Sequence, residues 1–154
     1  MRVPAAVVAG VLGLLQEVHL EVNSTMFNLG LKYLNILIIE DNPVNSILLS
    51  KLLMKRGYLV SCASSAEEGI NAAISDMPEL ILMDVGLPGM DGLEATRVLK
   101  FDPKTRNIPI IAVTAHAMRE DSEAAFAAGC DDYTTKPIII EKLTEKIEKI
   151  RVGP

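Results

Sequence analysis

The sequence predicts one α/β domain made of five strand–helix units, folded as a doubly wound parallel sheet with helices on both faces. Two observations support this prediction. From Asn35 onward, short apolar runs alternate with longer segments of helical periodicity. Three of the runs are apolar at consecutive positions, which is typical of parallel strands buried on both faces. A chain of 154 residues has room for one such domain and a short extension.

The expected strands are short and rich in β-branched or apolar residues. They are Ile36–Ile39, Tyr58–Ala63, Leu80–Met83, Ile110–Val113 and Tyr133–Thr135. The first, third and fourth are the continuously apolar ones. We therefore expect these three to be the most deeply buried.

Capping residues and glycines mark the limits of five helices. The residues that precede or open them are Asn42, Ser65, Asp91, Met118 and Pro137. Gly57 and Gly129 are expected to end the first and fourth helices. In the first helix we expect the apolar residues to form one face: Ile47, Leu48, Leu52 and Leu53.

Residues 1–34 are expected to form an N-terminal extension, and residues 35–152 the domain. The apolar stretch Val3–Leu15 is shorter than the roughly 20 residues that span a membrane. A small-x-small cleavage site does not follow it, so export is disfavoured. The extension is either an upstream stretch before a start at Met26 or a helix that packs on the domain. The chain has no linker after its last helix, so we expect no output domain there.

The composition narrows the class of partner. The chain carries 15 Lys and Arg against 20 Asp and Glu, a net charge of -5. This balance disfavours nucleic acid or an anionic membrane as the main partner. Cys62 and Cys130 lack metal-ligand spacing, so we interpret them as small hydrophobic residues of a cytoplasmic protein.

Polar residues follow four of the five expected strands. Glu40 and Asp41 end the first strand, Asp84 the third, Thr114 the fourth and Lys136 the fifth. The carboxyl ends of parallel strands meet at one edge of the sheet, where such folds bind ligands. We therefore expect these five side chains to converge.

Three converging carboxylates repel one another unless a cation lies between them. Oxygen ligands with room for water suit Mg²⁺. A nearby lysine and hydroxyl complete a site for phosphoryl transfer, in which a carboxylate such as Asp84 is the covalent acceptor. Taken singly, each residue has an ordinary structural interpretation. Asp41, for example, could serve only as a helix-capping residue.

Four segments resemble the receiver domain of two-component response regulators. They are Ile38–Asn42, Leu82–Gly92, Val113–Ala115 and Tyr133–Pro137. The resemblance extends from Asn35 to about Arg151. Two further stretches, Asn42–Asn45 and Ala115–Met118, are similar to single-domain cell-cycle regulators and to receivers of hybrid sensor kinases.

The resemblance implies a flavodoxin-like sheet with strand order 2-1-3-4-5. It implies that Asp84 accepts a phosphoryl group from a histidine kinase or histidine phosphotransfer protein. The implied Mg²⁺ ligands are Glu40, Asp41, Asp84 and the backbone carbonyl of Gly86. Thr114 and Lys136 would bind phosphoryl oxygens, and a cis peptide bond would join Lys136 to Pro137.

The resemblance also implies a switch rather than an enzyme that turns over a substrate. Tyr133 would follow Thr114 and change the surface around the fourth helix, fifth strand and fifth helix, which a downstream protein would bind. Gly86 and His116 would tune hydrolysis of the phosphoryl group. The exposed part of the first helix is expected to dock the histidine donor through Val44, Asn45 and Leu48.

Three alternatives stay open at this point. The chain could be a free-standing regulator or a receiver module of a hybrid sensor histidine kinase. An aspartate-nucleophile phosphohydrolase also uses Asp and Mg²⁺, but it usually has a second Asp where this chain has Gly86. A flavodoxin-type nucleotide binder would need a phosphate-binding loop after the first strand, where the carboxylates of Glu40 and Asp41 would repel a phosphate.

Overall fold

The computed structural model describes residues 4, 6–7, 9–11, 13–15, 17–18, 21 and 33–153. The described residues between positions 6 and 21 are helical, and the expected alternative start at Met26 lies outside the described residues. Among the helices described, none is long and apolar enough to cross a membrane.

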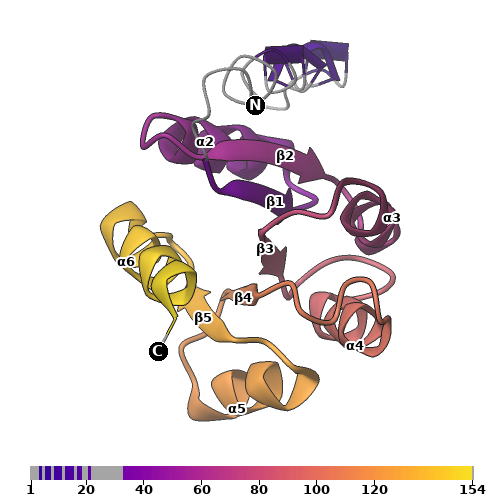
Figure 1. The fold of residues 1–154 in the computed structure, drawn as a ribbon, viewed down its shortest axis with the longest axis vertical. Helices are drawn as coiled ribbons and strands as arrows, with labels where there is room; N and C mark the ends of the chain where they lie inside the picture. Colours follow the sequence, from indigo (N-terminus) through magenta and orange to yellow (C-terminus); the bar gives the residue numbers. More distant parts are fainter. Residues whose placement is uncertain are drawn as a thin grey trace.

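Five parallel strands form one sheet, and every expected strand is present (Figure 1). The strands are β1 (Asn35–Ile39), β2 (Leu59–Ala63), β3 (Leu80–Asp84), β4 (Ile110–Thr114) and β5 (Asp132–Thr135). Their order is β2-β1-β3-β4-β5, with all four neighbouring pairs parallel. The predicted flavodoxin-like topology is therefore confirmed.

Helices cover both faces of this sheet. They are α2 (Pro43–Met54), α3 (Ala66–Asp76), α4 (Gly92–Phe101), α5 (Arg119–Ala128) and α6 (Ile140–Val152). Helices α2 and α6 cover one face, while α3, α4 and α5 cover the other (Figure 1). Each face has its own apolar core, so the sheet is the middle layer of three.

Alternation along each strand assigns its side chains to one core or the other. In β1, Ile36 and Ile38 pack toward α2 and α6, whereas Leu37 and Ile39 pack toward α3 and α4. These four side chains are at most 1% exposed. The burial agrees with the continuous apolar run that predicted a two-sided strand.

The predicted caps hold the helix starts. Asn42 accepts hydrogen bonds from the backbone N–H groups of Val44 and Asn45, and Ser65 accepts one from Glu68. Asp91 accepts one from Glu94 at the start of α4. These bonds satisfy N–H groups that have no partner within the helix.

The first helix differs from its prediction in two ways. It ends at Met54, and a turn of two further residues precedes Gly57, whose φ is +87°. Its buried face also contains serines, since the buried residues are Ser46, Leu49, Ser50 and Leu53. Leu48 is 57% exposed instead of lying on that face.

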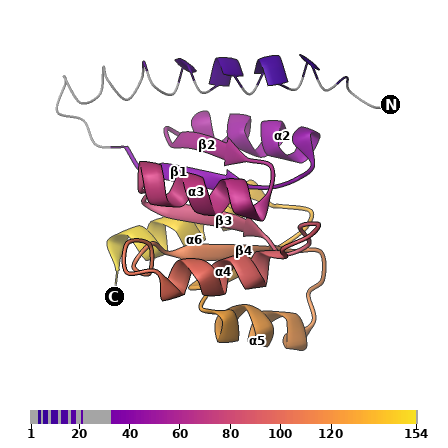
Figure 2. The same ribbon diagram turned by 90° about the vertical axis from the view of Figure 1, so that its right-hand side faces the viewer.

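The strands all point toward one edge of the sheet, as Figure 2 shows from the side. Every helix then runs back, so its first turn lies near the carboxyl ends of the strands and its last turn near their amino ends. The last residues of β3 and β4, and the residues that directly follow β1 and β5, therefore meet at the carboxyl edge.

Candidate functional site

Three charged side chains form the centre of the site at the carboxyl edge. The ammonium of Lys136 lies 3.2 Å from Asp84 Oδ2 and 3.1 Å from Glu40 Oε2. Asp84 is 5% exposed and Glu40 is 7% exposed. By strand alternation, all three side chains lie on the side of the sheet that α2 and α6 cover. One lysine thus bridges two buried carboxylates at the ends of β1 and β3.

Asp41 adds a third carboxylate to this group. Carboxylate oxygens of Glu40, Asp41 and Asp84 all lie within 4.8 Å of one another. Asp41 is exposed, so the cluster opens to solvent on that side. Hard oxygen donors, two of them buried and one open to water, fit Mg²⁺, which keeps several waters when it binds a protein.

Backbone N–H groups hold the two buried carboxylates in place. Gly86 donates to Asp84 Oδ1 at 3.0 Å, and Asn42 donates to Glu40 Oε1 at 3.0 Å. The same Asn42 caps α2 through its side chain, so one residue fixes both the helix start and Glu40. Each carboxylate therefore has one oxygen fixed by a backbone amide and the other facing Lys136.

Thr114 and Lys136 are tied together through the backbone. The amide of Lys136 donates to the carbonyl oxygen of Thr114 at 2.8 Å, and the Lys136–Pro137 peptide bond is cis. The Thr114 hydroxyl oxygen accepts the N–H of His116 at 3.2 Å, so its own hydrogen can be donated elsewhere. Thr114 is 6% exposed, whereas the His116 side chain is exposed.

Charge and burial act against each other in this cluster. Burial is the largest influence on the pKa of Glu40 and raises it; the N–H of Asn42 opposes it, and the charge of Asp84 adds to it. Burial also disfavours the charged form of Lys136. Its bonds to Glu40 and Asp84 outweigh that effect and raise the pKa of the ammonium. The hydrogen bond and charge of Lys136 lower the pKa of Glu40 and so oppose the effects of burial and of Asp84.

Tyr133 lies on the other side of the sheet from this ion pair. It is the register partner of Ala112, whose side chain belongs to the core under α3, α4 and α5. Thr114 is two residues after Ala112, so it faces the same side as Tyr133. The ring of Tyr133 meets Phe126 edge-on at 5.9 Å, and the ammonium of Lys146 lies 5.5 Å from its centroid.

The residues expected to dock a partner lie beside the cluster. Val44 and Leu48 are 53% and 57% exposed, and Asn45 is also exposed. A groove of about 490 Å³ lies between α2 and the loop after β5. Its lining residues are Glu40, Asn45, Leu48, Leu49, Leu52, Lys136, Pro137 and Ile138. The groove is apolar along α2 and Ile138 and charged where it meets the cluster.

The sequence interpretation missed Gly92 as a site residue. A Cβ atom at this position would clash with the backbone carbonyl oxygen of Asp84 and come within 2.9 Å of the Val85 Cα. The Gly92 N–H donates to the Val85 carbonyl at 3.1 Å. The lack of a side chain therefore lets α4 begin directly against the backbone of Asp84. The glycine that follows the capping Asp91 was the available signal.

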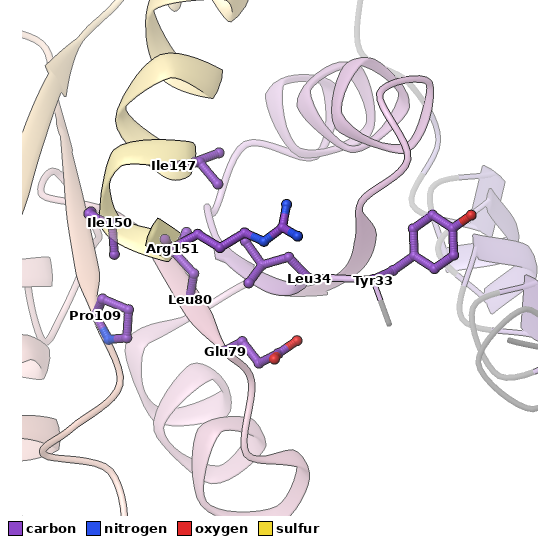
Figure 3. Close-up of a pocket in the computed structure, with 8 residues that line it drawn as sticks. All are labelled: Tyr33, Leu34, Glu79, Leu80, Pro109, Ile147, Ile150 and Arg151. Carbon is purple, nitrogen blue, oxygen red and sulfur yellow. The ribbon is translucent and has the colours of Figure 1, made fainter. Parts of the chain in front are cut away.

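Another cavity, of about 400 Å³, lies at the opposite edge, where the strands begin. Its lining residues are Tyr33, Leu34, Glu79, Leu80, Pro109, Ile147, Ile150 and Arg151. Figure 3 shows the Arg151 side chain extending from the end of α6 toward Leu34. None of the residues predicted to carry chemistry lines this cavity, so the cluster at the carboxyl edge is the candidate site.

Comparison with known families agrees with this geometry. A family model described as the response regulator receiver domain matches residues 36–148. The polar-differentiation response regulator DivK of Brucella ovis is 41% identical over 114 residues, which are 74% of this chain and 93% of the relative. DivK of Brucella anthropi is 40% identical over the same length.

Solved structures give the same result. A putative response regulator from Chloroflexus aurantiacus has a TM-score of 0.76 and 30% identity, covering 79% of this chain and 100% of its own. The receiver domain of sensor histidine kinase PA1611 from Pseudomonas aeruginosa, solved with a magnesium ion in its active site cleft, has a TM-score of 0.70 and 35% identity, with 76% and 96% coverage. The Vibrio cholerae chemotaxis protein CheY4 has a TM-score of 0.72 at 23% identity, which supports the fold alone.

Proposed function

The chain belongs to the response regulator receiver domain family of two-component phosphorelays, and from this premise we propose that Asp84 is its phosphoacceptor. The observation that carries the proposal is the position of this carboxylate. It is buried at the end of the central strand β3 and lies 3.2 Å from the ammonium of Lys136. Asp41 and Glu40 lie beside it, as an acceptor that works with a divalent cation requires.

The carboxylate of Asp84 attacks the phosphorus of a phosphohistidine, and the phosphorus–nitrogen bond breaks as the imidazole leaves with the electron pair. Lys136 neutralises negative charge that develops on the phosphoryl oxygens. Thr114 donates its hydroxyl hydrogen to one of these oxygens. Gly86 keeps the Asp84 carboxylate oriented through its N–H bond to Oδ1.

The carboxylates Glu40, Asp41 and Asp84 would hold Mg²⁺, with the carbonyl of Gly86 as a further ligand. A bound Mg²⁺ would supply charge stabilisation to the phosphoryl group as it transfers. The fit is supported by the donor set itself, since three oxygen ligands within 4.8 Å of one another suit a hard cation.

The phosphoryl group adds charge and acceptor oxygens at Asp84. This shifts the equilibrium between two conformations of the domain. Thr114 moves toward the new oxygens, and Tyr133 follows because it faces the same core. The surface of α5, β5 and α6 then changes for a downstream protein. Gly86 and His116, whose N–H groups donate to the side chains of Asp84 and Thr114, tune the lifetime of the phosphoryl group.

The histidine donor, a kinase or a phosphotransfer protein, docks on the groove between α2 and the loop after β5. Val44, Asn45 and Leu48 provide its exposed rim, and the groove leads directly to Lys136 and Glu40. An apolar centre beside a charged rim is the usual composition of a protein interface. A helical donor seated there would bring its histidine to the carboxyl edge.

The chain catalyses only its own phosphorylation and dephosphorylation, and it does not turn over other phosphoesters. The position two residues after Asp84 is Gly86, so the carboxylic acid that hydrolases use to protonate a leaving group is missing. The test is stoichiometry with Mg²⁺ and acetyl phosphate. Phosphoryl incorporation is expected to saturate at one group per chain, without steady release of phosphate from p-nitrophenyl phosphate. Sustained turnover of that ester would contradict the proposal.

A further inference from the structure

A basic surface lies at the end of α4, at the edge of the sheet opposite Asp84. The stretch 97–107 contains four Lys or Arg residues and one Asp, whereas the whole chain contains 15 basic and 20 acidic residues. This local excess of positive charge therefore stands out in an acidic protein. We define the α4 basic surface as five exposed residues of this stretch: Arg97, Val98, Phe101, Lys104 and Arg106.

The centre of the α4 basic surface is apolar. Phe101 is 90% exposed, the highest value among the large hydrophobic residues that the structure describes, and Val98 is 42% exposed. These residues are three positions apart on α4, so their side chains lie on the same face of the helix. An exposed aromatic residue next to a second apolar side chain is typical of a binding surface rather than of random exposure.

Three cations of the α4 basic surface have no polar partner among the described residues. In the described part of the chain, the side chains of Arg97, Lys104 and Arg106 make no hydrogen bond and no ion pair. Lys100 differs, because it donates to the carbonyl of Ile108 at 2.7 Å and pairs with Asp131 at 3.2 Å. Lys100 thus stabilises the fold, and the other three remain available to a partner.

Hydrogen bonds and buried side chains hold the turn that follows α4 in place. Thr105 is fully buried and its hydroxyl donates to the carbonyl of Leu99 at 2.7 Å. Asp102 accepts the N–H of Lys104 at 2.8 Å, and Ile108 anchors the turn at 6% exposure. A surface that is already ordered loses little conformational entropy when a partner binds.

We propose that the α4 basic surface binds an acidic polypeptide segment that carries at least one apolar side chain. Three free cations complement carboxylates, and Phe101 with Val98 offers the apolar contact. Nucleic acid is disfavoured, because binding commonly uses six to ten phosphate contacts and the rest of this chain would repel a longer polyanion. An anionic membrane is disfavoured too, since Lys100 is engaged within the fold and the three free cations are fewer than the four to eight Lys or Arg that are typical of lipid-binding segments.

The position of this surface makes its binding independent of phosphorylation. Asp84 lies at the carboxyl end of β3, whereas the residues after α4 precede the start of β4 at the other edge. In Figure 2 the last turn of α4 and the loop to β4 lie at the end of the sheet where the strands begin. The surface would tether the chain to a partner in both states of the switch.

The test uses the full chain labelled with ¹⁵N and a synthetic peptide that alternates Glu with Leu and Phe. Amide shifts are expected to concentrate in residues 97–107, equally before and after incubation of the wild-type chain with Mg²⁺ and acetyl phosphate. The combined substitution Arg97→Gln, Lys104→Gln, Arg106→Gln is expected to weaken binding by about tenfold or more, as is Phe101→Ser. The matched control removes three other exposed cations, through Lys55→Gln, Lys142→Gln and Lys149→Gln, and should bind like wild type.

Four outcomes would overturn the proposal. The first is the absence of shifts at about 1 mM peptide, the weakest affinity of interest. The second is equal weakening by the control substitutions. The third is binding of duplex DNA or of phosphatidylserine vesicles that depends on Arg97, Lys104 and Arg106 when the peptide does not bind. The fourth is self-association that depends on these cations, seen by sedimentation.

A peptide with Gln in place of Glu should not bind.

Discussion

Lys136 Nζ lies 3.2 Å from Asp84 Oδ2, although 52 residues separate the two in the sequence. The distance exists because β3 and β5 end at the same edge of the sheet, on either side of β4. The register pair Thr114–Thr135 and the bond from the Lys136 N–H to the Thr114 carbonyl fix where β5 ends.

Removing the charge of Lys136 is expected to slow phosphorylation of Asp84. In Lys136→Met, the rate of phosphoryl uptake from acetyl phosphate at saturating Mg²⁺ should fall about 10²–10³-fold, as when one charge-stabilising donor is lost. The measurement is a time course of intact mass, with circular dichroism to show that the variant is folded. Lys142→Met, an exposed lysine on α6, is the control. An unchanged rate in Lys136→Met would contradict the role of this ammonium.

Changing the groove beside α2 is expected to slow phosphoryl transfer from a protein donor but not from acetyl phosphate. Leu48→Ser should reduce the rate of transfer from a phosphorylated histidine phosphotransfer protein about tenfold, because an exposed apolar contact is lost. Uptake from acetyl phosphate should stay at the wild-type rate. Val152→Ser, at an exposed apolar position on the last turn of α6, should change neither. Equal loss with both donors would place Leu48 outside the docking surface.

Two glycines near Asp84 are expected to respond differently to alanine. In Gly92→Ala the new Cβ would meet the backbone of Asp84 and Val85, so α4 must shift. We expect a loss of about 1–3 kcal/mol in the free energy of unfolding in urea, with slower phosphorylation. In Gly86→Ala the Cβ would lie 3.6 Å from Asp84 Oδ1, an ordinary contact, so stability should hold. Equal stability of the two variants would refute the close packing of α4 on β3.

The raised pKa of Tyr58 leads us to expect a fall in the free energy of unfolding at high pH. Burial and its 2.7 Å hydrogen bond to Glu148 raise the pKa of this phenol to about 12, against about 10 in the unfolded chain. The ionised phenolate is thus disfavoured in the folded chain, and the stability that Tyr58 provides below pH 10 is lost as pH rises to about 12. The free energy of unfolding should fall over this range more steeply in wild type than in Tyr58→Phe. Parallel curves would contradict the shift.

The fold was predictable because hydrophobic pattern and capping residues agree along the chain. The two-sided burial of β1, β3 and β4 follows from their unbroken apolar runs, and Asn42, Ser65 and Asp91 cap helices as expected. The convergence of the carboxylates and Lys136 followed from one rule, that parallel strands end at one edge.

The inner face of α2 was not predictable in the same way. Its buried positions alternate Leu with Ser, and the pattern of Ile47, Leu48, Leu52 and Leu53 pointed to a different face. Ser50 is buried because its hydroxyl donates to the Ser46 carbonyl at 2.7 Å and lies 3.1 Å from Cys62 Sγ. Such local bonds remove the penalty of a buried hydroxyl, and only tertiary packing reveals them. The close approach of Gly92 to Asp84 was not predictable either, because it too depends on tertiary packing.

The central claim is that Asp84 accepts the phosphoryl group, and intact mass tests it most directly. After incubation with Mg²⁺ and acetyl phosphate, the wild-type chain should gain the mass of one phosphoryl group, and EDTA should prevent the gain. Asp84→Asn should show no gain, while Asp91→Asn, which alters the capping carboxylate of α4, should still gain it. An undiminished adduct on Asp84→Asn, or no adduct on the wild type, would contradict the claim.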